Sequence, residues 1–279
     1  MMNVLIPTDF SQNAWNAIEY ACDFFSNSPC NFYLLHINTP NTSVKPEATN
    51  DIEGDLGLDV LVKSPKKRLQ ETLQRINKSL PLNGNQRFFT ITDQGYMIDS
   101  IRRQVVDKKI DFIAMGTKGA SGYKKNNIGT NTGNVITKVM CNTLVIPENA
   151  KYTKLSEIAF PTDFHFFYLT ETLKPFSDII KRNNSATRVL YIDKKGGELN
   201  SDQKANKEFL VDYLSEHEHS FHFLANKNIE EGVENFVEMN KINLITMLAK
   251  NLNYFQKILF HPTMPKISYY TKVPFLILH

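Results

Sequence analysis

The strongest constraint on the fold is an internal repeat. The segment NVLIPTDF at residues 3–10 returns as EIAFPTDF at residues 157–164, so that an apolar run ends twice in the same four residues. Two further apolar runs recur in the same order: DFIAM at 111–115 returns as NLITM at 243–247, and TLVI at 143–146 returns as FLIL at 275–278. Three matches in one order, with an identical PTDF turn, predict two tandem copies of one domain.

The two copies differ in length. The first match has a numbering offset of 154 and the other two an offset of 132, so the second copy is 22 residues shorter between its first and fourth strands. Residues 39–56 are polar, lack periodicity and are rich in Pro, Asn and Thr. This composition predicts a long loop inserted in the first copy.

Apolar runs alternate with amphipathic segments. In the first copy we expect strands at residues 3–6, 31–37, 87–92, 111–115 and 143–146, and helices at 14–25, 60–80, 97–108 and 132–139. In the second copy we expect strands at 158–160, 188–192, 220–224, 244–247 and 274–278. This alternation predicts an α/β fold with a mostly parallel sheet and helices on both faces. We place the domains at residues 1–148 and 155–279, with a short polar linker at 147–154.

The composition excludes several classes of protein. The 279 residues, 42% of them apolar and 22% charged, fit two soluble globular domains. The net charge of +3 is too small to demand a nucleic-acid-binding surface. The first residues, MMNVLIPTDF, predict a β-strand and not a signal peptide, and no apolar run approaches the ~18 residues of a membrane span. An odd number of cysteines without a CxxC pair is typical of reduced thiols in a cytoplasmic protein: Cys22, Cys30 and Cys141.

A glycine-rich loop follows the fourth strand of the first copy. Gly116 ends the strand, Gly119 follows in the loop, and Gly129 and Thr130 open the next helix. Glycine permits a sharp turn and a close approach of a ligand to the backbone, and free N–H groups at a helix N-terminus favour an anion such as phosphate. The hydroxyls of Thr130 and Thr132 and the Asn131 amide could cap the helix or donate to phosphate oxygens. The spacing alone is equally consistent with simple turn glycines and an N-cap.

The same residues carry a resemblance to a known family. The pattern Gly-x2-Gly-x9-Gly-Thr after an apolar strand, the opening VLIPTDFS and the ending CNTLVIP at 141–147 resemble the nucleotide-binding branch of the universal stress protein family. The resemblance extends over the whole chain and identifies it as a tandem-domain member. It implies two five-stranded parallel sheets of the adenine nucleotide alpha hydrolase-like type, with strand order 3-2-1-4-5, packed as a pseudo-dimer. Strands 1 and 4 are neighbours in that order, and ligands bind at such a switch point, at the carboxyl ends of the strands.

The resemblance also implies a ligand and its site. The ligand would be ATP or AMP, and a Mg²⁺ ion with it is left open. Gly116, Gly119, Gly129 and Thr130 would hold the phosphates, Asp9 would meet the ribose or adenine end, and Ile37 would line the base pocket. The candidate binding residues are Thr8, Asp9, Ile37, Met115, Gly116, Gly119, Gly129, Thr130 and Asn131. Asp9 has an alternative role, because Asp163 stands at its place in the second copy, and capping the first helix would explain both.

The second copy lacks the loop. The offset of 132 puts Leu248 at the place of Gly116, Asn251 at Gly119, His261 at Gly129 and Pro262 at Thr130. Leucine covers the backbone that a phosphate would approach, and proline has no N–H to offer an anion. The second copy is therefore expected not to bind nucleotide in this way.

No other motif predicts a metal or catalytic site. His217, His219 and His222 have no regular ligand spacing and no cysteine beside them, so a solvated turn is favoured over a metal site. The sequence has no GxSxG, HExxH or Walker loop. No catalytic residues are proposed.

Two classes of function compete. The preferred one is a nucleotide-responsive regulator in stress response, whose bound or empty state alters contacts with a protein partner that the sequence does not identify. The alternative is an adaptor or structural protein whose glycine loop is a relic, and slow ATP hydrolysis is a third reading that lacks a visible general base. The expected mobile element is the loop at 39–56. The last strands of the two copies, 143–146 and 275–278, are expected to pair within one chain, and a further homodimer is left open.

Overall fold

A computed structural model describes the chain except for residues 40–63, 83, 118–129, 194–197, 226–228 and 251–271. The first half contains β1 (Met2–Pro7), α1 (Gln12–Phe24), β2 (Cys30–Asn38), α2 (Pro65–Ser79), β3 (Gln86–Gln94), α3 (Met97–Asp107), β4 (Phe112–Gly116), α4 (Thr130–Lys138) and β5 (Asn142–Ile146). The second half contains β6 (Glu157–Pro161), α5 (Thr170–Asn183), β7 (Ala186–Asp193), α6 (Ser201–Leu214), β8 (His219–Ala225), α7 (Ile229–Met239), β9 (Leu244–Leu248) and β10 (Phe275–Leu278).

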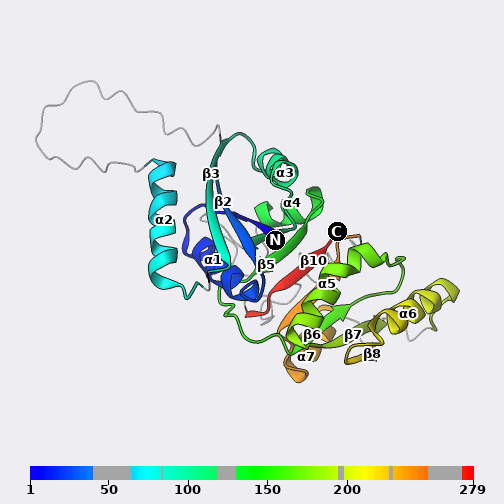
Figure 1. Ribbon diagram of the computed structural model, residues 1–279. Coiled ribbons are helices and arrows are strands. Elements are labelled where there is room, and N and C mark those ends of the chain that lie inside the picture. Colours follow the sequence, from blue (N-terminus) through cyan, green and yellow to red (C-terminus); the bar gives the residue numbers. More distant parts are fainter. Residues whose placement is uncertain (40–63, 83, 118–129, 194–197, 226–228, 251–271) are drawn as a thin grey trace, which may run out of the picture.

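The described strands form one sheet of ten, in the order β3-β2-β1-β4-β5-β10-β9-β6-β7-β8 (Figure 1). The strands within each half are parallel, whereas β5 and β10 are antiparallel, with Leu144 opposite Leu276. The order 3-2-1-4-5 therefore holds in both halves, and the predicted pairing of their last strands within one chain is confirmed. An approximate twofold axis relates the halves across the β5–β10 pair.

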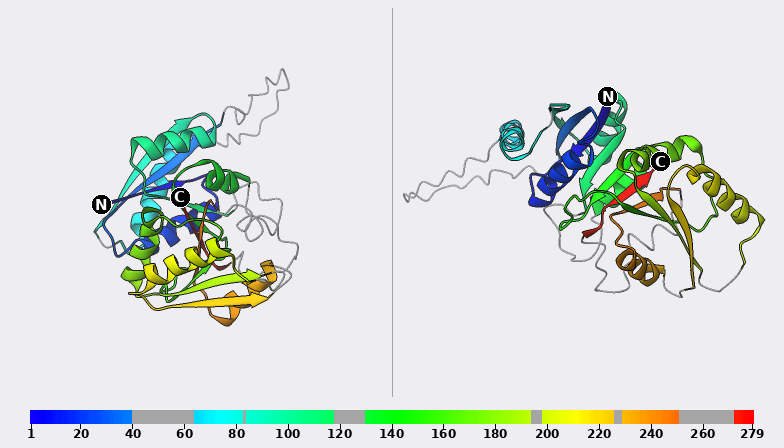
Figure 2. Two further views of the ribbon diagram at one scale, coloured as in Figure 1. Left: turned by 90° about the vertical axis from the view of Figure 1, so that its right-hand side faces the viewer. Right: turned by 60° about the horizontal axis from the view of Figure 1, so that its bottom comes forward.

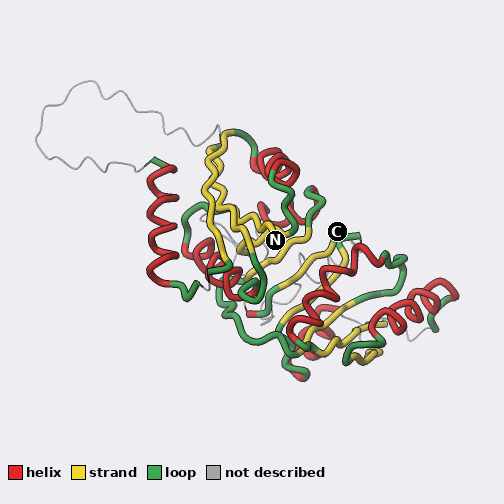
Figure 3. Tube along the Cα trace, in the orientation of Figure 1, coloured by secondary structure: helices red, strands yellow, loops and turns green. Residues whose placement is uncertain are grey.

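Helices cover both faces of this sheet, as Figure 3 and the two views of Figure 2 show. On one face a single apolar core runs across both halves and takes in residues of α1, α2, α5 and α6. On the other face α3 and α4 cover a first-half core, and α7 covers a second-half core. Ile136 of α4 belongs to the second-half core, so this helix crosses the seam between the halves.

The repeat extends to unusual backbone conformations. Phe10 and Phe164, the last residues of the two PTDF turns, have φ values of 63° and 56°. Lys109 and Lys241, which precede β4 and β9, have φ values of 48° and 51°. Left-handed residues other than glycine are uncommon, so their recurrence at matching positions shows that the two halves share one backbone frame.

One expected boundary was wrong. The helix expected at residues 60–80 begins at Pro65, with the Ser64 hydroxyl accepting from the backbone N–H of Lys67. Ser-Pro is a strong start signal, because serine caps the helix and proline suits its first turn. The loop expected at 39–56 lies, apart from Thr39, outside the described residues.

Candidate functional site

A cavity of about 170 Å³ lies at the carboxyl ends of β1, β2 and β4, beside the start of α4. This is the place where the strand order reverses its direction of winding, as expected for a ligand site in a parallel sheet. Its lining includes both apolar and polar side chains. Six of the candidate residues line it: Thr8, Asp9, Ile37, Met115, Gly116 and Asn131.

The remaining candidates do not line the cavity in the described chain. Thr130 is exposed at the first position of α4 and is not part of the lining. Gly119 and Gly129 lie outside the described residues. The predicted phosphate loop is therefore represented by its two ends, Gly116 and the first turn of α4.

The PTDF turn is held by its own side chains. Thr8 Oγ1 accepts a hydrogen bond from the Phe10 backbone N–H at 3.0 Å, and Asp9 Oδ1 accepts from the Ser11 N–H at 3.0 Å. Ser11 in turn caps α1 by accepting from the Ala14 N–H at 3.2 Å. Short polar side chains favour such local bonds, which fix the strand end that borders the cavity.

The equivalent turn in the second half makes the same bonds. Thr162 Oγ1 accepts from the Phe164 N–H at 3.1 Å, and Asp163 Oδ1 accepts from the His165 N–H at 3.1 Å. A structural role in the turn is thus shared by both aspartates. Ser11 and not Asp9 caps the first helix. The expectation that Asp9 caps this helix was therefore wrong, and Asp9 instead accepts from the N–H of the capping residue.

Thr132 has a different role from the one expected. Its side chain is buried, and its hydroxyl donates to the Gly116 carbonyl at 2.8 Å. This bond ties the first turn of α4 to the end of β4, and both residues line the cavity. The Thr132 hydroxyl proton is therefore used within the protein and is not free for a phosphate.

Several lining residues were missed from the sequence, among them His36, Thr39 and Met97. His36 Nδ1 donates to the Thr8 carbonyl at 2.9 Å, because a carbonyl can only accept. Its ring lies 4.6 Å from that of Phe10. His36 could have been predicted, because it precedes the candidate Ile37 at the end of a strand. Met97 could not, because its position in the cavity depends on how α3 packs.

The PTDF turn of the second half makes further contacts that the first-half turn lacks in the described part of the chain. Phe164 is fully buried and stacks on Tyr191 with ring centroids 5.5 Å apart. From α6, Gln203 Nε2 donates to the Asp163 carbonyl and Asn206 Nδ2 to the Phe164 carbonyl, both at 2.8 Å. The Thr162 hydroxyl is bonded to the Tyr168 hydroxyl at 2.6 Å, and burial raises the pKa of Tyr168.

The substitution expected at the fourth strand is also present. Leu248 ends β9 and is buried, at the place that Gly116 occupies in β4. The other second-copy replacements, Asn251, His261 and Pro262, lie outside the described residues. The sequence predicted this replacement at Leu248, whereas the bonds from α6 to the PTDF turn were not predicted.

The described residues contain no group of three His, Cys, Asp or Glu side chains that could hold a metal ion. Of the histidine cluster, His219 Nδ1 bonds to the His217 carbonyl at 2.8 Å, and His222 Nε2 lies 2.7 Å from Ser220 Oγ. Burial and the nearby Arg188 lower the pKa of His222. In the described part of the chain, none of the helices is both long and apolar enough to cross a bilayer.

Comparisons with known proteins agree with this architecture. A universal stress protein from Archaeoglobus fulgidus DSM 4304 is 15% identical, covers 99% of this chain and 97% of its own, and has a TM-score of 0.64. A putative universal stress protein from Pseudomonas aeruginosa UCBPP-PA14 is 10% identical, covers 100% and 93%, and has a TM-score of 0.59. At these identities the likeness concerns the fold.

A third similar structure is of a universal stress protein in complex with cAMP, with 17% identity, 53% and 98% coverage and a TM-score of 0.37. No curated protein matches the sequence. The model of the universal stress protein family matches residues 1–147, which is more than half of the chain. The chain therefore belongs to the universal stress protein family.

Proposed function

We propose that this chain is a nucleotide-responsive regulatory protein that binds ATP or AMP in the cavity between β1 and β4 of its first half. The observation that carries the proposal is the convergence of six candidate residues, from four separate segments, on one cavity at the switch point of the sheet. The second half, in this proposal, binds no nucleotide because the buried Leu248 stands where Gly116 ends β4.

The chemistry of the lining fits an adenine nucleotide. Ile37, Met97 and Met115 offer apolar surface for a base, and Asp9 offers a carboxylate for ribose hydroxyls. Asn131 lies in the first turn of α4, where backbone N–H groups and the helix dipole favour phosphate. The described cavity is smaller than the roughly 300 Å³ of a typical ligand site. In this proposal it holds part of the nucleotide, and the phosphates would lie toward the first turn of α4.

The regulatory part of the proposal needs an element whose position depends on occupancy. The described chain offers α2, which buries only Leu69 and Ile76 among its fifteen residues. Arg68 of this helix lies over the Phe10 ring, 4.1 Å from its centroid, and Phe10 in turn lies against His36 of the cavity. A ligand that moves His36 would therefore move Phe10 and alter the contact between Phe10 and Arg68 of α2.

The test compares matched substitutions in the two halves. Asp9→Asn and Asp163→Asn both keep a side-chain oxygen for the turn, so both variants are expected to fold. Only Asp9→Asn is expected to weaken nucleotide binding, by about tenfold, since a hydrogen bond to a charged group contributes about 1.5–3 kcal/mol. Gly116→Val should abolish binding, because it adds three carbon atoms at a residue that lines the cavity.

Binding is measured by isothermal titration with ATP and AMP, and checked by thermal shift. Ligand at about 100 times Kd adds about 2.7 kcal/mol of stability. Equal losses in the Asp9 and Asp163 variants, or equal shifts in the native and Gly116→Val proteins, would place the nucleotide elsewhere. No shift with either nucleotide in the native protein would favour the adaptor function.

A further inference from the structure

A hollow of about 220 Å³ lies between α1 and α2, beside the PTDF turn of the first half. Arg68 and Arg75 line it from α2, and Phe10 and Trp15 line it from the turn and from α1. Thr8 is shared with the proposed nucleotide cavity, whereas the other lining residues of the two differ. We call this space the α1–α2 hollow.

The two arginines are held against aromatic rings. The guanidinium carbon of Arg68 lies 4.1 Å from the centroid of the Phe10 ring, and that of Arg75 lies 3.6 Å from the centroid of Trp15. A ring attracts the positive charge but gives the guanidinium N–H groups no oxygen partner. Neither guanidinium makes a hydrogen bond or ion pair with any residue that the structure describes. Two positioned guanidiniums therefore border one hollow with N–H groups available for an acceptor.

The rest of the lining also favours an anion. Glu71 is the only carboxylate among the lining residues, and it already takes part in another interaction. Ser11, the N-cap of α1, lines the hollow too, so the positive end of the α1 dipole borders it. The buried Thr8 hydroxyl accepts from the Phe10 N–H and can donate its own proton. Positive charge and hydrogen-bond donors thus outnumber the single carboxylate.

The second half uses different chemistry at the equivalent place. There α6 takes the position of α2, and Gln203 and Asn206 donate to carbonyls of the PTDF turn at 2.8 Å. These amides are neutral and bond directly to the turn. In the first half, Arg68 approaches its turn through the face of the Phe10 ring, and the α1–α2 hollow remains beside it. Paired arginines over aromatic rings are therefore not a general requirement for holding this helix on the sheet.

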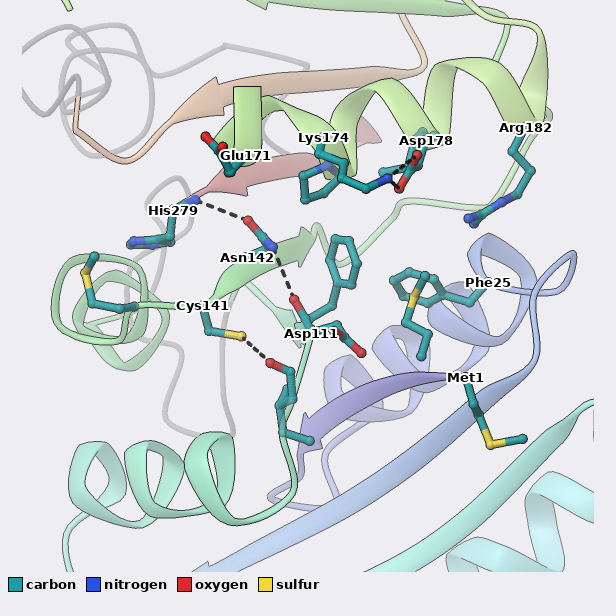
Figure 4. Close-up of a pocket in the computed structure, with 16 residues that line it drawn as sticks. Met1, Phe25, Asp111, Cys141, Asn142, Glu171, Lys174, Asp178, Arg182 and His279 are labelled. Carbon is teal, nitrogen blue, oxygen red and sulfur yellow. Dashed lines mark hydrogen bonds and ion pairs between the residues drawn. The ribbon is translucent and has the colours of Figure 1, made fainter. Parts of the chain in front are cut away.

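A larger hollow, of about 670 Å³, lies between α5 and the amino ends of β1, β4 and β5 (Figure 4). Its lining carries both signs of charge, with three carboxylates and two cations: Asp111, Glu171, Asp178, Lys174 and Arg182. Figure 4 also shows that Lys174 pairs with Asp178 on the same helix, at 2.9 Å. This balance favours no one class of charged ligand, in contrast to the α1–α2 hollow.

From these features we propose that the α1–α2 hollow binds a phosphate group, as free phosphate or as the end of a phosphomonoester. The planar fork of a guanidinium matches the oxygen atoms of a phosphate, which it binds through two N–H groups at once. The volume is below the roughly 300 Å³ of a drug-sized pocket, which suits a small oxyanion or one end of a ligand. In this proposal Arg68 and Arg75 hold the phosphate oxygens and the Thr8 hydroxyl donates to them. The proposal does not depend on nucleotide binding.

The experiment uses the full chain and its single tryptophan, which lines the hollow. Sodium phosphate is added at constant ionic strength and the emission of Trp15 is recorded, because an anion that draws Arg75 from the ring changes the surroundings of the indole. Line broadening of the phosphate signal in ³¹P NMR gives a second readout that does not need the tryptophan. We expect saturable binding with a Kd of about 1 mM or lower. Glycerol 3-phosphate, titrated in the same way, distinguishes a monoester from free phosphate as the ligand.

Matched substitutions on α2 test the assignment. Arg68→Gln should weaken phosphate binding about tenfold, the loss expected for one hydrogen bond to a charged group. Arg68→Lys should restore only part of the affinity, because lysine keeps the charge without the fork. Glu71→Gln removes the carboxylate from the lining and should strengthen binding, by up to about fivefold. Lys78→Gln removes the same charge from an exposed part of α2 outside the hollow and should have no effect.

Three results would overturn the proposal. Equal weakening by Arg68→Gln and Lys78→Gln would mean that phosphate is attracted by the general charge of α2. Loss of phosphate binding in Gly116→Val, which leaves the α1–α2 hollow unchanged, would place the phosphate in the nucleotide cavity. Absence of both the fluorescence change and the line broadening up to about 20 mM phosphate would show that the hollow binds no such group. Normal phosphate binding without any binding of ATP or AMP would refute the proposed function alone.

Discussion

Replacing Leu276 by alanine tests whether the two halves unfold as one cooperative unit. Leu276 is fully buried in β10, where it lies opposite Leu144 of β5 and beside Thr246 of β9. The substitution removes three carbon atoms, worth about 2.4 kcal/mol at about 0.8 kcal/mol each, and leaves a cavity. We expect the free energy of unfolding to fall by about 3 kcal/mol in total.

The assay uses the fact that the chain has one tryptophan, Trp15. It lies in α1 of the first half, is buried, and has the Arg75 guanidinium 3.6 Å from its ring. Its fluorescence therefore reports unfolding of the first half, whereas the substitution is in the second. Because one apolar core and one sheet span both halves, the urea midpoint seen by Trp15 should shift together with the midpoint seen by far-UV circular dichroism.

Leu169→Ala makes the same chemical change at a side chain that is 44% exposed, and it should cost less than about 1 kcal/mol. The reasoning would be refuted by a Trp15 transition that stays in place while circular dichroism becomes biphasic. In that case the β5–β10 pair would join two domains that unfold independently.

Two further predictions concern the linker and the thiols. Asn16→Ala should cost about 1–2 kcal/mol, since it removes two hydrogen bonds that hold the linker, and should speed tryptic cleavage after Lys151, whereas the exposed Asn149→Ala should do neither. Burial raises the pKa of three cysteine thiols to about 12, 11 and 12, so the unfolded chain, with thiols near 8.5, loses protons first as the pH rises. The free energy of unfolding should then fall by about 1.4 kcal/mol per pH unit for each thiol between pH ~8.5 and ~11, a slope measurable by urea titration and reduced by alanine at any one of Cys22, Cys30 and Cys141.

The predictable parts of the fold are those that depend on residues close together in the sequence. The PTDF turns recur because threonine and aspartate bond to backbone groups only two residues away, and the strands next to them are continuous apolar runs. The partnership of β5 with β10 followed from the repeat, because an open parallel edge in each copy favours pairing. Six candidate site residues could be named since they all stand at strand ends or a helix start.

The parts that were not predictable depend on contacts between distant segments. Gln203 and Asn206 bond to the second PTDF turn from a helix about 40 residues further along the chain, and periodicity within α6 does not show which way this helix packs. The same holds for Met97 in the cavity and for the linker on α1. Thr132 was misjudged because its nearest acceptor, the Gly116 carbonyl, is brought to it by the sheet.

The linker itself makes the two halves unequal. In a twofold pair of separate chains the surfaces of α1 and α5 would be equivalent, and each could contact the same kind of segment. A covalent connection leaves β5 once and enters β6 once, so it can contact only one of these two helices, and here it contacts α1. The contacts of Asn16, Glu19 and Tyr20 with the linker therefore stabilise α1 alone. A circularly permuted chain whose linker lies along α5 would lose these contacts and should be less stable than the native chain.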